Sequence, residues 1–119
     1  ISSTESVLKK LFPVFDNVER AVQALPPPVL QTATLKPVAD GVRIISTQFI
    51  SAFAGMGLTR IDCEGQFDPT VHEAVQQVTS DQPTGTIVTE LQSGWTMGDF
   101  VLRAAMVSVS KGSTKNLEK

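Results

Sequence analysis

The residues whose types could do chemistry gather in one short segment, EGQFDPTVHEAV, residues 64–75. It holds three carboxylates, Glu64, Asp68 and Glu73, and the only histidine of the chain, His72. A histidine beside carboxylates could transfer protons as a general acid or base, or it could bind a metal ion. The segment could equally serve the architecture, because an aspartate before a proline favours a turn and a histidine can hydrogen-bond the backbone.

Both chemical interpretations lack residues that they need. One imidazole with scattered carboxylates offers too few nitrogen or sulfur ligands for zinc. Catalysis would need a nucleophile or a second base, and no G-x-S-x-G, phosphate-loop or H-E-x-x-H motif accompanies the segment. The only cysteine, Cys63, lies between Asp62 and Glu64, whose negative charges disfavour its thiolate. We therefore interpret the segment as structural and predict no catalytic residue, no metal site and no cofactor.

Composition excludes further classes of function. Of the 119 residues, 41% are hydrophobic and 18% are charged, which is typical of a folded chain and not of a disordered one. The net charge of −2 gives no field that would favour nucleic acid or an anionic membrane, so neither is a predicted partner. The apolar runs are too short to span a bilayer. A single cysteine allows no intrachain disulfide, which fits a reducing compartment, and the start, ISSTES, resembles neither a signal peptide nor an Arg-rich leader.

Two helices are predicted in the first half of the chain. Residues 5–25 carry apolar side chains every three or four positions, as in a helix packed on one face. Pro13 predicts a kink or break of this helix near Phe12, because proline lacks a backbone donor and clashes with the preceding turn. A stiff proline-rich linker is expected over residues 26–37, and Pro37 suits the first position of the next helix.

The second helix is apolar on two faces. One face has residues spaced alternately by four and three, as in a helix-bundle seam; its members are Val38, Val42, Ile45, Phe49, Ala52 and Met56. A second flank is formed by Ile44, Ile50 and Phe53. One small helical hairpin could not cover both faces alone, so the sequence predicts self-association.

Residues 58–112 have a different sequence pattern from residues 1–57. Short β-rich runs, TIVTEL, FVLR and MVSVS, alternate with the turn-forming stretches EGQFDP, SDQPTG, QSGW and MGD. This pattern predicts a small, mostly antiparallel β domain. In VHEAVQQV the spacing of Val71, Val75 and Val78 is helical, so the pattern alone leaves helix and strand equally open. Residues 113–119 are polar and are expected to be disordered.

Three stretches together resemble the GrpE family, the nucleotide exchange factors of DnaK-type chaperones. LFPVFDNVERAV resembles the family's leucine-proline-valine-x-aspartate-x-leucine-x-arginine helix, and FDPTVHEAVQQV resembles its F-D-P-x-x-H-E-A segment. GWTMGDFVLRAAMVSVSKG resembles its closing stretch, and Gly41 falls where the family keeps a glycine. The resemblance covers nearly the whole chain in the right order. Family members carry a long stalk helix before this region, of which the first residues here would be the end.

The resemblance implies an α+β fold that assembles as a parallel homodimer. Residues 1–57 would form a helical hairpin, two of which make a four-helix bundle, and residues 58–112 would form the β domain. HEAVQQV would then be a strand. The residues expected at the dimer contact are Phe15, Val18, Val22, Val38, Val42, Ile45, Phe49 and Met56.

The function that the resemblance implies is that of a co-chaperone, not an enzyme: it would accelerate ADP release from the nucleotide-binding domain of a DnaK-type chaperone. The partner contacts carried over from the family are Gln23, Ala24, Leu91, Phe100, Arg103 and Val109. The compartment would be the bacterial cytoplasm, the plastid stroma or the mitochondrial matrix. Two alternatives stay open: a dimeric scaffold or adaptor without exchange activity, and a small hydrolase built on Asp68, His72 and Glu73.

Three side chains near the end of the chain have open alternatives. Trp95 either packs in the core or anchors a partner, and Arg103 pairs either with a carboxylate of a partner or with one of its own domain. Phe100 stands where many family members have arginine. In a regular strand Phe100 and Arg103 would point to opposite faces, so both could contact a partner only if a bulge or turn near Asp99 intervened.

Overall fold

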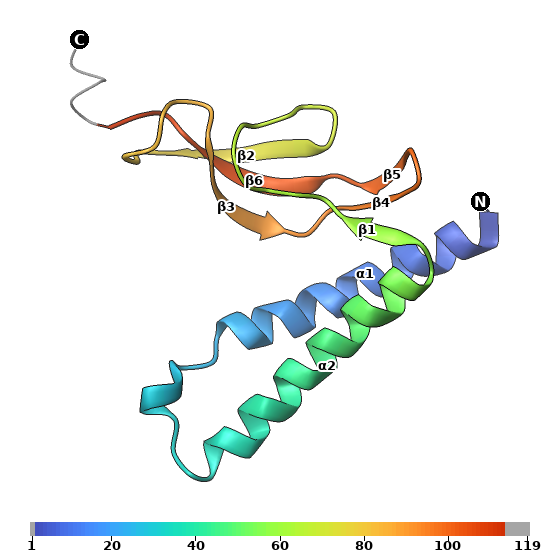
Figure 1. The fold of residues 1–119 in the computed structure, drawn as a ribbon, viewed down its shortest axis with the longest axis vertical. Helices are drawn as coiled ribbons and strands as arrows, with labels where there is room; N and C mark the ends of the chain where they lie inside the picture. The colour runs from blue at the N-terminus through green and yellow to red at the C-terminus, as the bar shows by residue number, and fades with distance from the viewer. Residues whose placement is uncertain (1, 114–119) are drawn as a thin grey trace. The chain divides into compact units, whose positions relative to one another are not determined.

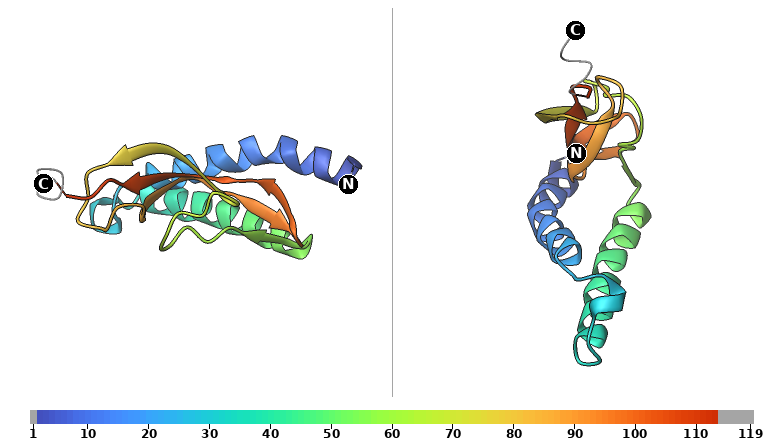
Figure 2. Two further views of the ribbon diagram at one scale, coloured as in Figure 1. Left: turned by 90° about the horizontal axis from the view of Figure 1, so that it is seen from above. Right: turned by 90° about the vertical axis from the view of Figure 1, so that its left-hand side faces the viewer.

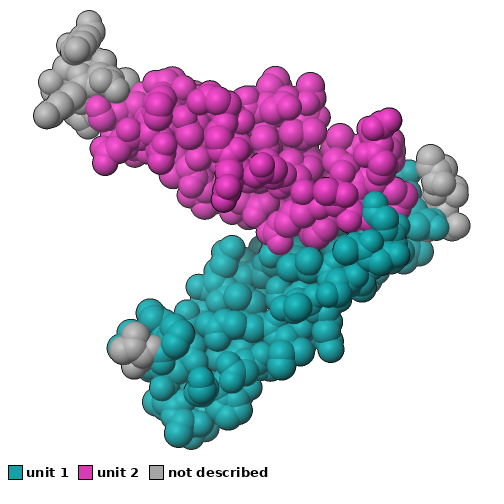
Figure 3. Space-filling view, in the orientation of Figure 1, with its two compact units in different colours: residues 1–57 teal, residues 58–119 magenta. Residues whose placement is uncertain are grey.

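The chain folds into two compact units, residues 1–57 and residues 58–119 (Figure 3). The computed structural model describes residues 2–113, with the side chains of residues 2, 3 and 29 left out. The first unit is helical and the second holds the strands, so the predicted α+β class is confirmed. Of the tail that was predicted to be disordered, only Ser113 lies within the described residues.

The first unit is a helical hairpin. Helix α1 spans Ser2–Gln23, a short 3-10 helix η1 spans Pro28–Leu30, and helix α2 spans Leu35–Gly55 (Figure 1). Between the helices a cluster of phenylalanine rings packs edge to face, with ring centroids 5.6 Å apart for Phe12 and Phe53 and 5.5 Å apart for Phe15 and Phe53. Neither helix within the described residues is long and apolar enough to cross a membrane.

The proline-based predictions in this unit need two corrections. Helix α1 continues through Pro13, so of the predicted kink or break near Phe12 the break is wrong. Proline removes one hydrogen bond, and burial of apolar side chains on both sides of it, Phe12 and Phe15, outweighs that loss. Helix α2 begins at Leu35, two residues before Pro37. Proline is tolerated there because the first-turn N–H groups of a helix have no intrahelical acceptor.

The second unit contains two small sheets. The first has the strand order β1-β4-β5 with antiparallel pairs, and the second has the order β2-β6-β3, in which β2 is parallel and β3 antiparallel to β6. The strands are β1 (Leu58–Arg60), β2 (His72–Val78), β3 (Ile87–Gln92), β4 (Trp95–Met97), β5 (Phe100–Arg103) and β6 (Ala105–Ser110). The three predicted β-rich runs are confirmed, and HEAVQQV is a strand, as the family resemblance implied.

One long β-hairpin joins the two sheets. Strand β3 passes into β4 through Ser93 and Gly94, and β5 passes into β6 through Ala104, so both arms of the hairpin bend at the same level (Figures 1 and 2). A Cβ atom on Gly94 would lie 2.3 Å from the backbone nitrogen of Ala105, a distance that atoms of two residues cannot keep. Glycine is therefore required where the two arms approach each other.

The core of this unit lies on one face of the second sheet. Its buried members come from the loop after β1 and from β3 and β6: Ile61, Ile87, Ala105, Val107 and Val109. Four partly buried side chains pack against them: Cys63, Phe67, Val71 and Val101. Alternate residues of β6 supply this face, as expected for a strand with one face in the core.

We predict that Gly94→Ala strongly destabilises the second unit, by about 3 kcal/mol, because the new methyl group can be accommodated only by moving backbone. Thermal unfolding followed by circular dichroism measures the loss. Gly55→Ala is the matched control, since a Cβ at Gly55 would have no neighbour within 4 Å. An equal melting temperature for Gly94→Ala and the parent would show that the arms do not approach as described.

Candidate functional site

His72, the residue most able to do chemistry, is buried and hydrogen-bonded to the backbone on both sides of its ring. Its Nδ1 accepts the N–H of Asp68 at 3.0 Å, so the hydrogen of the neutral ring is on Nε2. Nε2 lies 2.7 Å from the carbonyl oxygen of Asp62 and donates to it. Because both nitrogens are used in this way, His72 ties the loop after β1 to the start of β2. The geometry supports a structural role.

The carboxylates of the segment do not converge on His72. Asp68 accepts hydrogen bonds from the Thr70 backbone N–H at 2.9 Å and the Thr70 hydroxyl at 2.6 Å, and these bonds lower the pKa of Asp68. Such a capped aspartate initiates a turn. Glu73 is exposed on the edge of β2. Among the described residues, no group of three or more His, Cys, Asp and Glu side chains could hold a metal ion.

We predict that His72→Ala lowers the free energy of unfolding by about 1–3 kcal/mol, since it leaves the Asp68 N–H without its acceptor inside the fold. Chemical denaturation measures the loss, and Glu73→Ala, an exposed neighbour, should have little effect. The folded fraction of His72→Ala should keep its binding properties. If His72→Ala were as stable as the parent protein but had lost the activity of the parent, the hydrolase alternative would be favoured instead.

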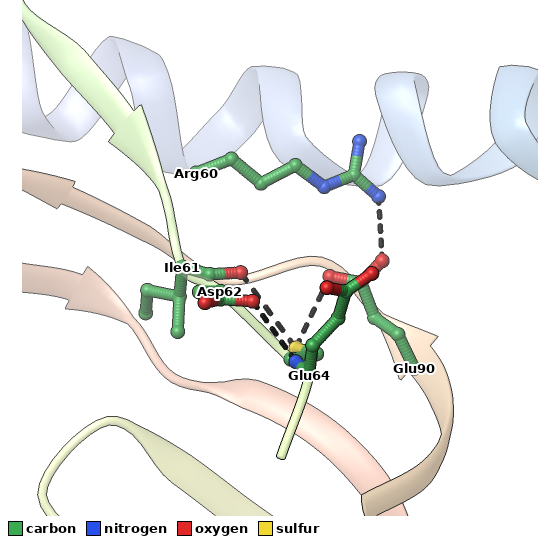
Figure 4. A pocket seen from close by; sticks show the side chains of 6 residues that line it. Arg60, Ile61, Asp62, Glu64 and Glu90 are labelled. Atoms are coloured by element: carbon green, nitrogen blue, oxygen red, sulfur yellow. Dashed lines mark hydrogen bonds and ion pairs between the residues drawn. The ribbon is translucent and has the colours of Figure 1, made fainter.

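A second polar cluster lies in an open pocket of about 420 Å³. Its lining residues are Arg60, Ile61, Asp62, Cys63, Glu64 and Glu90 (Figure 4). Glu90 of β3 accepts from Arg60 Nη2 at 2.8 Å through one oxygen, and its other oxygen lies 3.4 Å from the Cys63 Sγ. The Arg60 guanidinium also lies over the Trp95 ring, 5.8 Å from its centroid. The pocket thus has a salt bridge at its centre that joins β1 to β3.

Cys63 is held as a thiol in this pocket. Burial raises its pKa to about 12, with Glu90 as the next cause and a smaller contribution from Asp62. The sequence correctly indicated an unreactive thiol, but it named the flanking carboxylates and missed Glu90. No sequence signal relates Glu90 to Cys63, because 27 residues separate them. A thiol that stays protonated at neutral pH is a poor nucleophile.

The raised pKa predicts slow alkylation of Cys63. In the folded protein iodoacetamide should modify it at least about tenfold more slowly than in denaturant at pH 8, because only the thiolate attacks. Mass spectrometry of timed samples measures both rates. Glu90→Gln removes the negative charge beside the sulfur and should accelerate the reaction, whereas Glu64→Gln is the control. Equal rates in folded and unfolded protein would contradict this environment.

The residues predicted to contact a partner differ in their exposure to solvent. Leu91 and Phe100 are each 48% exposed in the second unit, and Gln23 and Ala24 are exposed at the end of α1. Val109 belongs to the hydrophobic core of the second unit and is 6% exposed. The side chain of Val109 is therefore not exposed in this fold, and its contact with a partner stays an untested prediction. The β6 face that carries it packs inward.

Arg103 is held within its own unit. Its Nε and Nη2 donate to the carbonyl oxygen of Ser93 at 2.9 and 2.6 Å, and Nη2 also donates to the Ser93 hydroxyl at 3.2 Å. Trp95 is 1% exposed, so it packs in the core and is not an exposed anchor. Asp99 lies in the turn between β4 and β5, and a bulge lies at Leu102, since Trp95 is paired with Arg103 but Thr96 with Val101. We therefore do not place Arg103 on a partner-facing surface.

The helical hairpin leaves part of its apolar surface open in the single chain. Phe15, one of the expected dimer residues, is fully buried inside the hairpin against Phe49 and Phe53. Val18, Val22, Val42 and Phe49 are partly buried. The exposed members of the expected set are Val38, Ile45 and Met56. The expected dimer residues therefore fall into an inner set, which holds the hairpin together, and an outer set, which is exposed in the single chain.

Exposed apolar residues form a stripe along each helix. Val38, Ile45 and Ala52 on α2 are exposed and spaced by seven residues, which returns each to nearly the same face. Helix α1 has an equivalent exposed set, Val7, Val14 and Ala21, also spaced by seven. We call these six residues the outer stripes. The α1 stripe was missed in the sequence, although its heptad spacing was the signal that could have shown it.

Comparisons with known proteins agree with this architecture. The sequence model of the GrpE family matches residues 2–111. Similar proteins include the Protein GrpE of Zymomonas mobilis subsp. mobilis, 34% identical over 96% of this chain and 62% of the relative, and that of Hyphomonas neptunium, 39% identical over 94% and 62%. The Protein GrpE of Brucella anthropi is 41% identical over 90% of this chain and 48% of the relative.

The chain belongs to the GrpE family. It spans about half to three-fifths of the length of these curated relatives.

Proposed function

We propose that this chain is a GrpE-type nucleotide exchange factor that accelerates ADP release from the nucleotide-binding domain of a DnaK-type chaperone. The observation that carries the proposal is the family match over residues 2–111, which includes both the helical hairpin and the β unit. The chemistry of the second unit agrees with it. Both ring nitrogens of His72 are hydrogen-bonded to the backbone, and burial raises the pKa of Cys63 to about 12, so neither residue is well suited to catalysis.

The proposed mechanism works through binding energy and breaks no bond. A factor that binds the open form of the nucleotide-binding domain better than the closed form shifts the domain towards the open form. The shift cannot exceed the ratio of the two affinities. ADP then leaves from the open form faster, and ATP, which favours the form that the factor binds poorly, displaces the factor. Among the three expected compartments we propose the bacterial cytoplasm, because the relatives described above are bacterial.

The factor works as a homodimer in this proposal. The outer stripes are apolar, lie on helices whose other apolar face is already buried, and keep a seven-residue spacing, which is the period of helix-bundle seams. Two hairpins that bring these stripes together form a four-helix bundle. The expected dimer residues Val38, Ile45 and Met56 would then be buried by the partner, while Phe15 acts from inside the hairpin.

Two neighbouring isoleucines provide a matched test of this dimer. Ile45 lies in an outer stripe and is 46% exposed in the single chain, whereas Ile44 is 56% exposed and lies about 100° away around the helix. Ile45→Asp should weaken dimerisation by about a hundredfold or more, because it buries an unpaired charge at the seam. Ile44→Asp, on the neighbouring flank, should weaken dimerisation much less.

Analytical ultracentrifugation over a concentration series measures both variants and the parent. A parent protein that sediments as a monomer, or an Ile45→Asp variant that dimerises like the parent, would exclude the bundle.

The proposed partner-facing surface centres on the tip of the β4–β5 hairpin. Phe100 is paired with Met97 across a two-residue turn formed by Gly98 and Asp99, and its ring is half exposed. Exposed aromatic side chains at such tips are frequent anchors in protein interfaces. Leu91, at the end of β3, is exposed as well, and we propose it as a second contact. Gln23 and Ala24, at the end of α1, stay proposed contacts.

Release of a fluorescent ADP analogue from a DnaK-type nucleotide-binding domain tests the function. We predict that the parent protein increases the release rate, and that Phe100→Ala weakens binding by about tenfold or more, because truncating an interface aromatic typically costs about 2 kcal/mol. Val88→Ala is the control, since Val88 is an exposed apolar residue of the same unit outside the proposed surface.

Stopped-flow fluorescence gives the release rates, and calorimetry gives the affinities. Unchanged release with the parent protein would favour the scaffold or adaptor. Unchanged affinity of Phe100→Ala, with lower stability, would make Phe100 a structural residue.

A further inference from the structure

We propose that Arg103 is a positioning residue: by fixing the bend of the long β-hairpin it sets the orientation of the tip that carries Phe100. This inference rests on the proposed function, because the tip matters only if it faces the chaperone. The inference adds that Arg103 acts by binding Ser93 and not by contacting the partner.

The bend is the place where the hairpin passes from one sheet into the other. Strands β3 and β6 belong to the second sheet, and β4 and β5 belong to the first. At the bend both arms leave one sheet and enter the other, through Ser93 and Gly94 on one arm and Ala104 on the other. The close approach of Gly94 to Ala105 brings the arms together there. Backbone bonds to neighbouring segments hold each arm, from the Ile61 N–H to the Gly94 carbonyl and from the Ala105 N–H to the Val71 carbonyl, and a side chain links the two arms to each other.

Arg103 supplies that link. It is the last residue of β5, and its Nε and Nη2 both donate to the carbonyl oxygen of Ser93, on the opposite arm. The planar guanidinium holds a fixed direction when two of its N–H groups share one acceptor. Ser93 is itself buried, and its hydroxyl accepts the indole N–H of Trp95 at 3.0 Å. We call Ser93, Gly94, Trp95 and Arg103 the hairpin joint.

The register of the β4–β5 pair makes the tip depend on the joint. Trp95 is paired with Arg103, but the next pair is Thr96 with Val101, so Leu102 is a bulge residue directly beyond the joint. A bulge interrupts the regular ladder and increases the local twist. Only two further ladder pairs lie between this bulge and the turn, the last of them Met97 with Phe100. Strand β4 is also paired with β1 from Trp95 to Met97, so Arg103 fixes the direction of β5, the edge strand that carries Phe100, against this frame.

The joint contains its own spectroscopic reporter, since Trp95 is the only tryptophan of the chain. Arg103→Met keeps a long apolar stem and removes the donors to Ser93. Ser93→Ala is the control: it removes the hydroxyl, which accepts from the Trp95 indole and, at 3.2 Å, from Arg103, and it leaves the carbonyl that accepts the two shorter Arg103 bonds. Both variants should change Trp95 fluorescence. Only Arg103→Met should lower the hydrogen-exchange protection of the amides between residues 95 and 103, by about tenfold.

Binding to the nucleotide-binding domain separates positioning from direct contact. We expect Arg103→Met to weaken binding by about tenfold, Arg103→Lys to restore part of the affinity, and Ser93→Ala to bind like the parent. In a double-mutant cycle with Phe100→Ala, the loss caused by Arg103→Met should shrink to about twofold, because the residue that it positions is already absent.

The outcomes distinguish this inference from the function that it rests on. A parent protein that does not bind the chaperone domain refutes the proposed function, and the positioning role with it. A parent that binds, together with losses for Arg103→Met and Phe100→Ala that simply add, makes Arg103 a direct contact and overturns the inference. Equal losses of affinity for Ser93→Ala and Arg103→Met would reduce the effect to general destabilisation and overturn it as well.

Discussion

The burial of apolar surface on the two helices is the constraint on which the assembly depends. A hairpin of two helices can cover one stripe of each, and here the phenylalanines Phe12, Phe15 and Phe53 fill that inner contact. The outer stripes stay in water in a single chain, at a cost that grows with the exposed apolar area. A second hairpin of the same kind removes this cost. The α1 and α2 sequences thus specify a local fold, and we propose that their remaining apolar face specifies an association.

The second unit has a different constraint, because its two sheets are very small. Neither sheet has more than three strands, and three-stranded sheets are close to the lower limit of independent stability. Polar contacts add to their stability. His72 hydrogen-bonds the loop before β2, the Arg60–Glu90 salt bridge joins β1 to β3, and Arg103 hydrogen-bonds Ser93 at the bend. His72, which looked chemically active in the sequence, has this structural role, which explains its burial and its two hydrogen bonds to the backbone.

Much of the fold could be predicted from the sequence, and the failures have physical reasons. Heptad-like spacing indicated both helices, and β-branched runs indicated β3, β5 and β6. Local rules failed at Pro13, where packing on both sides outweighs one lost hydrogen bond. HEAVQQV reads as helical because its bulge at Val75 disturbs the alternation that marks a strand. The contacts of Glu90 and Ser93 connect residues far apart in sequence, so no local pattern could show them. The burial of Val109 could not be predicted, because the family resemblance does not state which face of β6 packs inward.

The proposed exchange depends on differential affinity, since a ligand that binds two states equally does not shift the equilibrium between them. Linkage makes this reciprocal: if the factor lowers the affinity of the chaperone domain for ADP, then ADP must lower the affinity of the domain for the factor by the same ratio. The direct test is calorimetric titration of the factor into the DnaK-type nucleotide-binding domain, once without nucleotide and once saturated with ADP. The account predicts distinctly tighter binding to the nucleotide-free domain. Equal affinities in the two titrations would contradict it.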